Sequence, residues 1–150
     1  MARFTVGKGI TDYIANLQKI YNTTPEMIGK SIYQGAKVVT DAVHNEIAAL
    51  PASEVSGEQK AGLLDGLGIA KLKVDGTFAN VKVGMDGYNN VRTAKYPNGQ
   101  PNVMIARALI SGTSFHPQKN DFVRRAVNSS KTAAENAMRE EFDNQIKKYT

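Results

Sequence analysis

The sequence predicts an α+β domain in which a small antiparallel sheet packs against two long helices. Three observations lead to this prediction. An apolar stripe at helical spacing follows Pro25, two short segments of alternating polarity flank Asp75-Gly76, and a second apolar stripe at helical spacing follows Phe122. The chain has 150 residues, 41% hydrophobic and 22% charged, which is enough for one domain with one core.

The N-terminal half predicts two helices separated by a break. Thr11-Asp12 can cap a short first helix, whose apolar positions are Ile10, Tyr13, Ile14, Leu17 and Ile20. Asn22-Thr23-Thr24 interrupts this pattern. Thr24 followed by Pro25 favours a new helix start, because threonine caps helices and proline suits their first position. The stripe Ile28, Ile32, Ala36, Val39, Val43 and Ile47 then predicts a long helix to about Leu50, which Pro51 ends.

The middle of the chain predicts a hairpin between two loops. Residues 51–68 are rich in Gly, Ser and Glu, which indicates a surface loop with one helical turn near Ala61–Leu64. The hairpin spans residues 69–83 and turns at Asp75-Gly76. Its apolar positions, which we expect on the covered face, are Ala70, Leu72, Val74, Ala79, Val81 and Val83. Residues 84–102 form a second long loop. We expect loops 51–68 and 84–102 to be mobile or ordered by a partner.

The C-terminal part predicts a third strand and then a long helix. The apolar run 103–111 is typical of a fully buried strand, and Gly112-Thr113 ends it. A sheet of three strands leaves two edges open to a neighbouring subunit. The helix starts at Phe122, with a kink expected at Ser129-Ser130 and a second cap expected from Thr132 with Glu135.

Composition excludes several classes of site. The chain has no cysteine, so it forms neither a disulfide framework nor a thiolate metal site. The acidic pair Glu140-Glu141 points to two helix faces and has no nearby histidine. There is no apolar signal core and no run of about 18 apolar residues, so we expect a soluble protein that is not exported. The net charge of +5 is spread along the chain, so no dedicated nucleic-acid face is evident.

The segment 108–127 contains residue types found in hydrolases. Ser114 or Ser111, His116 and Asp121 could form a triad, but triad members usually come from distant parts of a chain. The sequence also lacks a G-x-S-x-G motif. We therefore expect no catalytic residue, although a hydrolase using Ser114 and His116 stays an alternative.

Other candidates in the sequence are weaker. Gly112-Thr113-Ser114 lacks the further glycine and the lysine of a phosphate loop. His44 follows the stripe position Val43, which indicates a structural or solvated histidine. Lys119, Arg124 and Arg125 lie near a helix start and could contact DNA phosphates or an acidic partner. The alternative is that the two arginines flank an apolar stripe and face solvent.

The layout of the chain resembles a family of phage morphogenesis proteins, the small head–tail joining or tail-completion proteins of long-tailed phages, also called minor tail components. The resemblance covers roughly residues 25–148. It depends on a Gly-Thr turn, a proline, and a phenylalanine that starts a long helix with an alanine shortly after it; these are Gly112, Thr113, Pro117, Phe122 and Ala126. The family's element after the first loop is matched by Gly62, Leu63 and Leu64. Asp121 stands where the family usually has a proline, and Ile110-Ser111 where it often has an acid.

The resemblance implies assembly rather than catalysis. It implies a homo-oligomeric ring, six-fold or twelve-fold, in the neck of the virion around the DNA channel, assembled in the host cytoplasm. The implied partners are a head-completion or connector protein and a tail terminator or tail tube protein, with DNA passing through without sequence-specific binding. It implies no cofactor, no metal and no membrane. Loops 51–68 and 84–102 would carry the contacts between subunits or with the neck. The alternative function is a small basic nucleic-acid-binding module.

Overall fold

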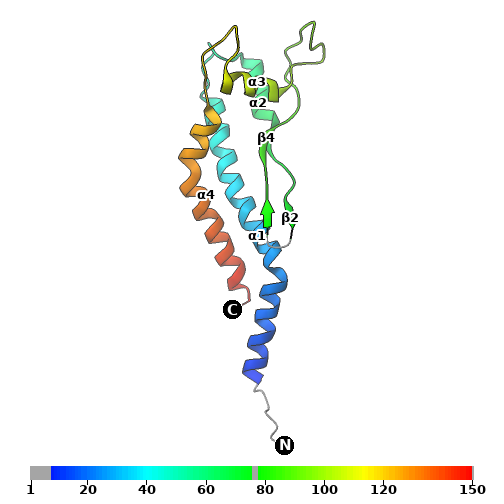
Figure 1. Cartoon of the computed structure of the whole chain (residues 1–150), viewed down its shortest axis with the longest axis vertical. Helices are drawn as coiled ribbons and strands as arrows, with labels where there is room; N and C mark the ends of the chain where they lie inside the picture. Colours follow the sequence, from blue (N-terminus) through cyan, green and yellow to red (C-terminus); the bar gives the residue numbers. More distant parts are fainter. Residues whose placement is uncertain (1–7, 76–77, 150) are drawn as a thin grey trace, which may run out of the picture.

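The computed structural model describes residues 8–75 and 78–149 and has two long helices as its frame. Helix α1 (Lys8–Ala48) extends through much of the length of the molecule, and helix α4 (Phe122–Lys147) runs antiparallel along its C-terminal half (Figure 1). A narrow hairpin lies beside α1, and helices α2 (Gly57–Gly66) and α3 (Asn102–Ser111) lie at one end of the molecule (Figure 1). The predicted α+β class with two long helices and a small antiparallel sheet is confirmed; the two helices pack on each other, and the hairpin contacts α1.

The predicted break before Pro25 is wrong, because α1 is one continuous helix with Pro25 inside it. The preceding threonines stay helical by bonding to carbonyl groups one turn back. The Thr23 hydroxyl donates to the carbonyl oxygen of Lys19 at 2.7 Å, and the Thr24 hydroxyl donates to that of Ile20 at 2.6 Å. Threonines that serve as caps in other helices therefore lie within this one.

Residues 51–68 contain more regular structure than predicted. Helix α2 spans Gly57–Gly66 rather than a single turn. Its start is a capping box, in which the Ser56 side chain accepts from the Gln59 N–H at 3.1 Å and the Gln59 side chain accepts from the Ser56 N–H at 3.0 Å. The Ser-x-x-Gln spacing was the available signal. Only residues 51–56 form the predicted loop, and Val55 is buried there.

The hairpin is longer than predicted and is built in two segments. Strand β1 (Leu67–Ile69) pairs with β4 (Val83–Met85), and β2 (Lys73–Asp75) pairs with β3 (Phe78–Asn80), all antiparallel. Asp75 pairs with Phe78, so it belongs to a strand and not to the predicted turn; Gly76 lies outside the described residues.

A bulge separates the two segments of the hairpin. Ile69 pairs with Val83 and Lys73 with Asn80, so residues 70–72 face only residues 81–82. The extra residue changes which side chains face α1. Ile69 and Leu72 are both half-buried, whereas Ala70, predicted on the covered face, is exposed. The other predicted positions with described side chains, Leu72, Ala79, Val81 and Val83, are half-buried as expected.

The predicted third strand at 103–111 is wrong, because this segment is helix α3. A short apolar run does not distinguish a buried strand from a buried helix, and its Ala, Leu and Met content favours a helix. Burial was also predicted for this run, and Ile105, Ala106 and Leu109 are buried. In the described part of the chain the sheet is only a hairpin, so the expected three-stranded sheet with two open edges is wrong as well.

Residues 86–101 form the predicted second loop, and hydrogen bonds within it hold its two ends together. The Asn89 side-chain oxygen accepts from the backbone N–H groups of Val91 and Gln100, at 2.9 and 3.1 Å. The Asn89 N–H donates to the Gln100 carbonyl oxygen at 2.9 Å. The mobility expected for this loop stays a prediction.

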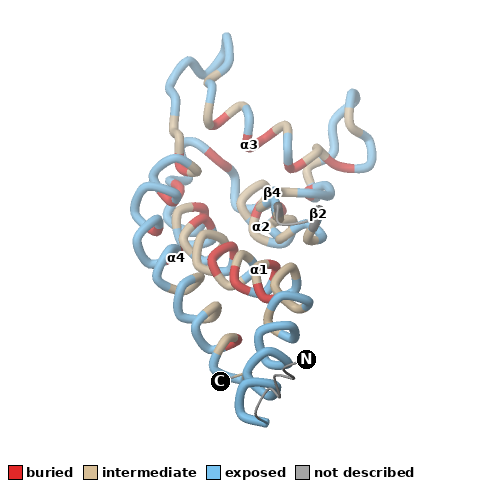
Figure 2. Tube along the Cα trace, turned by 60° about the horizontal axis from the view of Figure 1, so that its bottom comes forward, coloured by how far each residue is buried: buried red, intermediate tan, exposed pale blue. Residues whose placement is uncertain are grey.

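The core lies where the C-terminal half of α1 meets α2, α3 and the start of α4 (Figure 2). Its buried residues are Val43, Ile47, Leu50, Val55, Leu63, Ile105, Ala106, Leu109, Phe122 and Ala126. We call residues 8–24 of α1 the arm. The arm lies beyond this core, and its predicted stripe positions Ile10, Tyr13, Ile14 and Leu17 are exposed.

Candidate functional site

The residues that carry the resemblance meet at the connection between α3 and α4, which we call the elbow (residues 112–121). Gly112 ends α3 with φ 74° and ψ 170°, and its N–H donates to the Ala108 carbonyl oxygen at 2.9 Å. A Cβ on Gly112 would lie 2.9 Å from the carbonyl oxygen of Pro117. Both the positive φ and the close carbonyl therefore require glycine at this position.

Backbone hydrogen bonds close the elbow on itself. The Thr113 N–H donates to the His116 carbonyl oxygen at 2.8 Å, and the His116 N–H donates to the Thr113 hydroxyl at 3.0 Å. The Asn120 N–H returns to the Leu109 carbonyl oxygen at 2.7 Å. The chain is thus brought back beside α3 before α4 begins.

Helix α4 begins in the core. The Asp121 carboxylate accepts from the Arg124 N–H at 3.0 Å, which caps the helix. Phe122 and Ala126 have no exposed surface, which confirms that both face the core. The predicted Gly-Thr turn is real, but it ends a helix and not a strand.

The second cap predicted inside α4 is wrong, because the helix continues through Ser129-Ser130 and past Thr132 without interruption. The kink at Ser129-Ser130 stays a prediction. The Ser130 hydroxyl donates to the Ala126 carbonyl oxygen at 2.6 Å, so this buried polar group has a partner inside the helix.

The triad considered from the sequence is not assembled. Ser114 and His116 are exposed, and the Asp121 carboxylate is engaged in the helix cap. Among the described residues, no hydrogen bond joins any two of these three side chains. His44 is exposed on α1, far along the chain from the elbow.

The three basic candidates differ in their surroundings. Arg125 is engaged within the molecule, because its guanidinium group donates to the Glu46 carboxylate at 3.1 Å and to the Asn120 side-chain oxygen at 2.7 Å. Lys119 and Arg124 are exposed. Lys119 and Arg124 are accessible for a contact with DNA or an acidic partner, whereas Arg125, although 52% exposed, already has partners within the molecule. The contact of these three residues with DNA or an acidic partner stays a prediction.

Sequence reasoning missed the residues that hold Arg125. Asn120 links Arg125 to the loop before α2, since its side-chain amide donates to the Glu54 carboxylate at 2.5 Å. Glu46 joins the network from α1. Glu46 and Glu54 are distant in sequence from Arg125 and Asn120, and no local motif marks the network.

A cavity of about 390 Å³ lies beside the elbow. Its walls include Ile105 and Leu109 from α3, and its rim carries Glu54, His116 and Phe115. Phe115 is 92% exposed, so the elbow presents an aromatic side chain to its surroundings. No group of three or more His, Asp or Glu side chains that could hold a metal ion occurs among residues 8–75 and 78–149.

Within the described residues, no helix has the length and apolar character needed to cross a membrane. Comparison of the chain with models of protein families, with curated proteins and with solved structures finds no match.

Proposed function

We propose that the protein is a structural virion protein of a long-tailed phage or prophage that completes the tail or joins it to the head, as a ring in the neck around the DNA channel. The observation that carries this proposal is the elbow. The five residues of the resemblance, Gly112, Thr113, Pro117, Phe122 and Ala126, form one device that fixes α4 in the core. A turn that the chain shares with this family supports a shared fold, because these residues have structural roles in the turn and in the core.

Exposed apolar side chains support an assembly role. Phe115 at the elbow and Tyr88 in the second loop are largely exposed at one end of the molecule. The arm exposes further apolar residues at the other end. Contiguous apolar surface on a folded chain marks places where other proteins bind. A non-enzymatic protein that contacts neighbours at both ends fits a ring component between a head-completion or connector protein and a tail terminator or tail tube protein.

The positive charge supports a position around DNA. The net charge is +5, and exposed Lys119 and Arg124 are accessible to phosphates. Contacts of this kind do not read sequence, which suits DNA that moves through a channel.

Deletion of the gene from its phage or prophage tests the proposal. We expect filled heads and tails to accumulate separately, and a plasmid copy of the gene to restore joined virions. Normal numbers of joined, infectious particles in the deletion strain would refute the function. The mass of the purified protein, alone and mixed with neck or tail proteins, is the matching measurement in solution.

The loops give a second, finer test. Shortening residues 90–98, which keeps the buried Asn89, should leave the core intact but reduce joining, if this loop carries inter-subunit or neck contacts. In the first loop, replacing the exposed Ala52 and Ser53 keeps the buried Val55 and the cap Ser56 and should have the same effect. Virions that form at wild-type yield with either loop altered would show that the loop carries no essential contact.

A small basic nucleic-acid-binding module is the second candidate. Lys71, Lys73 and Lys82 are exposed on the polar face of the hairpin, which favours this candidate independently of the elbow. It predicts that the isolated protein binds duplex DNA with an affinity that falls steeply as salt rises. Absence of binding at low salt would remove this candidate.

A further inference from the structure

The arm carries an apolar stripe that nothing in the described part of the chain covers. Five large side chains on the arm are between 47% and 79% exposed; they are Ile10, Tyr13, Ile14, Leu17 and Tyr21. Together they offer apolar surface on the order of 500 Å². A stable protein interface buries about 800 Å² on each partner, so the stripe supplies much of what one interface needs.

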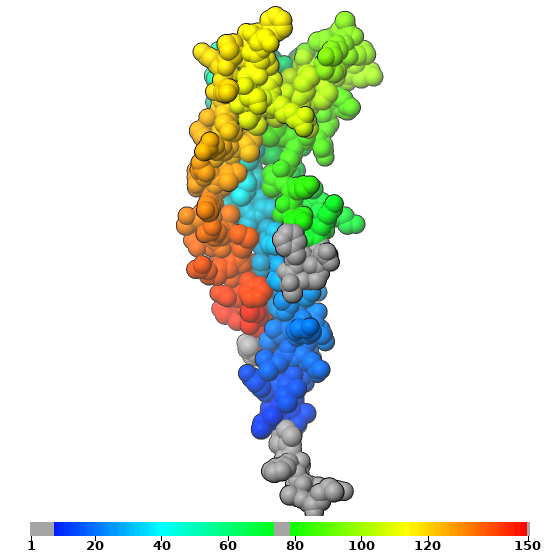
Figure 3. Space-filling view, viewed as in Figure 1, coloured from blue at the N-terminus to red at the C-terminus, as the bar shows by residue number. Residues whose placement is uncertain are grey.

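The stripe continues a face of α1 that already binds a helix. Leu17 and Gly35 are separated by five full turns at about 3.6 residues per turn, so they lie on the same side of α1. At Gly35 this side packs directly on α4, since a Cβ there would lie 2.6 Å from Cγ of Met138. Helix α4 ends at Lys147, and the arm projects beyond it (Figure 3). On the arm, the side of α1 that packs on α4 farther along the helix is therefore left without a packing partner in the described part of the chain.

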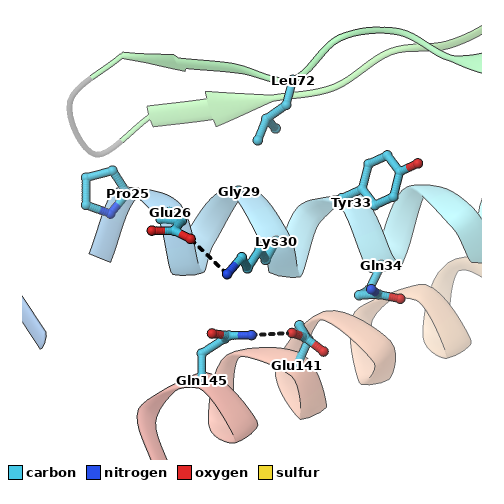
Figure 4. A pocket seen from close by; sticks show the side chains of 9 residues that line it. All are labelled: Pro25, Glu26, Gly29, Lys30, Tyr33, Gln34, Leu72, Glu141 and Gln145. Atoms are coloured by element: carbon cyan, nitrogen blue, oxygen red, sulfur yellow. Dashed lines mark hydrogen bonds and ion pairs between the residues drawn. The ribbon is translucent and has the colours of Figure 1, made fainter. Parts of the chain in front are cut away.

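The same chain carries an open groove at the base of the arm. The groove has a volume of about 720 Å³ and lies between α1, the hairpin and the C-terminal end of α4. Leu72 reaches toward it from the hairpin, Pro25 and Tyr33 line it from α1, and Gln145 lines it from α4 (Figure 4). Polar and charged side chains line it as well; these are Glu26, Lys30, Gln34 and Glu141. Gly29 contributes no side chain to its floor, so an apolar side chain from outside can approach the backbone of α1.

The stripe and the groove lie on different sides of α1. Gly29 and Tyr33 line the groove, whereas Gly35, in line with the stripe, faces α4. The direction of Gly35 differs from the mean direction of Gly29 and Tyr33 by roughly 140° around the helix axis. Because the arm is a rigid continuation of the same helix, it cannot fold back into the groove of its own chain.

We propose that the arm of one copy binds in the groove of the next copy, through the apolar stripe 10–21. The occupant is a second copy of this chain, because the chain itself supplies both an exposed apolar stripe and a groove in which Pro25, Tyr33 and Leu72 can contact it. Two different surfaces meet in this contact, so copies associate head-to-tail and either close into a ring or extend as a filament. The inference deepens the proposed ring function, and its meaning in the virion rests on that function.

Cross-linking tests the pairing of surfaces directly. The chain has no cysteine, so each introduced cysteine is unique. The Leu17→Cys and Tyr33→Cys variants are purified separately, treated with a short bis-maleimide alone or after mixing, and run on denaturing gels. We expect a covalent dimer in the mixture and none with either variant alone. A mixture of Leu17→Cys with Val103→Cys, which places the second thiol on α3, is the matched control and should give no dimer.

Each other result overturns the proposal. A dimer of Leu17→Cys alone would show that two stripes pack on each other about a two-fold axis. A mixture that gives no dimer, at a concentration where wild-type protein is oligomeric by light scattering, would show that subunits meet elsewhere. Wild-type protein that is a monomer at every concentration tested would show that the contact does not form.

A charge placed on the stripe gives an independent measurement. Ile14→Glu should reduce the mass in solution to that of one chain, because the contact would remove water from a carboxylate that replaces an apolar side chain. Ala15→Glu adds the same charge next to it but away from the stripe, and should leave the mass unchanged. Unchanged far-UV circular dichroism and melting temperature of both variants, measured as dilute monomers, would show that each still folds.

The contact and the proposed function can fail separately. If Ile14→Glu stays oligomeric and still restores joined virions to a deletion strain, the arm contact is wrong and the function stands. If Ile14→Glu dissociates but deletion of the gene leaves joining intact, the contact stands and the function is wrong.

Discussion

The two halves of α1 carry similar apolar stripes but differ in what covers them. From Met27 to Ile47 the helix is packed against α4, the hairpin and the other helices, and Met27, Val43 and Ile47 are buried. From Ile10 to Tyr21 the stripe is exposed. Helical spacing of apolar residues therefore predicts that a helix has a binding face, but it does not tell whether the same chain supplies the partner.

The largest predicted difference between the two halves of α1 is in the free energy of unfolding after one isoleucine in each half is truncated. Ile47 is fully buried in the core, so Ile47→Ala should lower the free energy of unfolding by about 2–5 kcal/mol. Ile14 is 52% exposed, so Ile14→Ala should change it by less than about 0.5 kcal/mol in dilute solution. Chemical denaturation monitored by circular dichroism measures both.

The dependence of the melting temperature on protein concentration also distinguishes the two halves of α1. Association raises the melting temperature of the species that binds, so the wild-type melting temperature should rise with concentration. In Ile14→Ala this rise should be smaller, whereas in Ile47→Ala it should persist from a lower starting point. Equal losses of stability in the two variants at low concentration would mean that the arm is covered within one chain.

Two glycines of α1 provide the next largest contrast. Gly35 is buried against Met138 and Ala134 of α4, so Gly35→Leu should push the helices apart and cost about 1–3 kcal/mol of unfolding free energy. A Cβ added at Gly9 would meet no atom within 4 Å, so Gly9→Leu should have an effect within about 0.5 kcal/mol. Thermal unfolding of the two variants measures the difference. A tolerated Gly35→Leu would show that α4 does not approach α1 closely there.

The two long helices could be predicted largely from local patterns, and the error at residues 103–111 has a physical cause. The stripes of α1 and α4 extend over many turns, so their period is unambiguous. The run 103–111 would complete only about two and a half helical turns, and its period is hidden because nearly every side chain is apolar. Burial of Ile105 and Leu109 was predictable, whereas their secondary structure depended on packing against α2 and α1.

The elbow was the most predictable part of the candidate site. The role of Gly112 follows from its backbone conformation, and the roles of Phe122 and Ala126 follow from their apolar side chains. Each of these properties can be recognised from a single residue. Arg125 was not predictable, because its partner Glu46 is distant in sequence and only the fold brings them together. The bulge at residues 70–72 was likewise invisible, since strand register depends on how the hairpin fits against α1.

The bridge from Arg125 to Glu46 should contribute far less than the core around it. The two side chains are 52% and 29% exposed, so solvent screens their attraction. Arg125→Ala should lower the unfolding free energy by about 0.2–1 kcal/mol. The neighbouring Arg124→Ala should have no measurable effect on stability, because Arg124 is exposed and its backbone N–H, which Asp121 caps, is retained.

A double-mutant cycle with Glu46→Gln separates the bridge from other effects of each change. We expect the coupling between the two positions to account for most of the loss in Arg125→Ala. If the two losses add without coupling, the stability comes from packing of the arginine stem or from its hydrogen bond to Asn120.

The smallest predicted effect lies at the boundary between the two halves of α1. The Lys30 ammonium, 2.8 Å from the Glu26 carboxylate, lowers the pKa of that carboxyl group, and Glu26 in turn raises the pKa of Lys30. A carboxyl group with a lowered pKa contributes stability above its ordinary pKa, and this contribution is lost as pH falls through the lowered value. Glu26→Gln should therefore melt slightly below wild type near neutral pH and together with it in acid.

Salt should remove the same difference, because both side chains of this pair are exposed. The matched control is Glu135→Gln on α4, which forms no ion pair with any other described residue and should give no pH-dependent difference. A Glu26→Gln difference that persists in acid or in high salt would mean that the side chain acts by packing at the groove and not by charge. Since Glu26 also lines the groove, that result would place a steric contact where the arm of a neighbouring copy is proposed to bind.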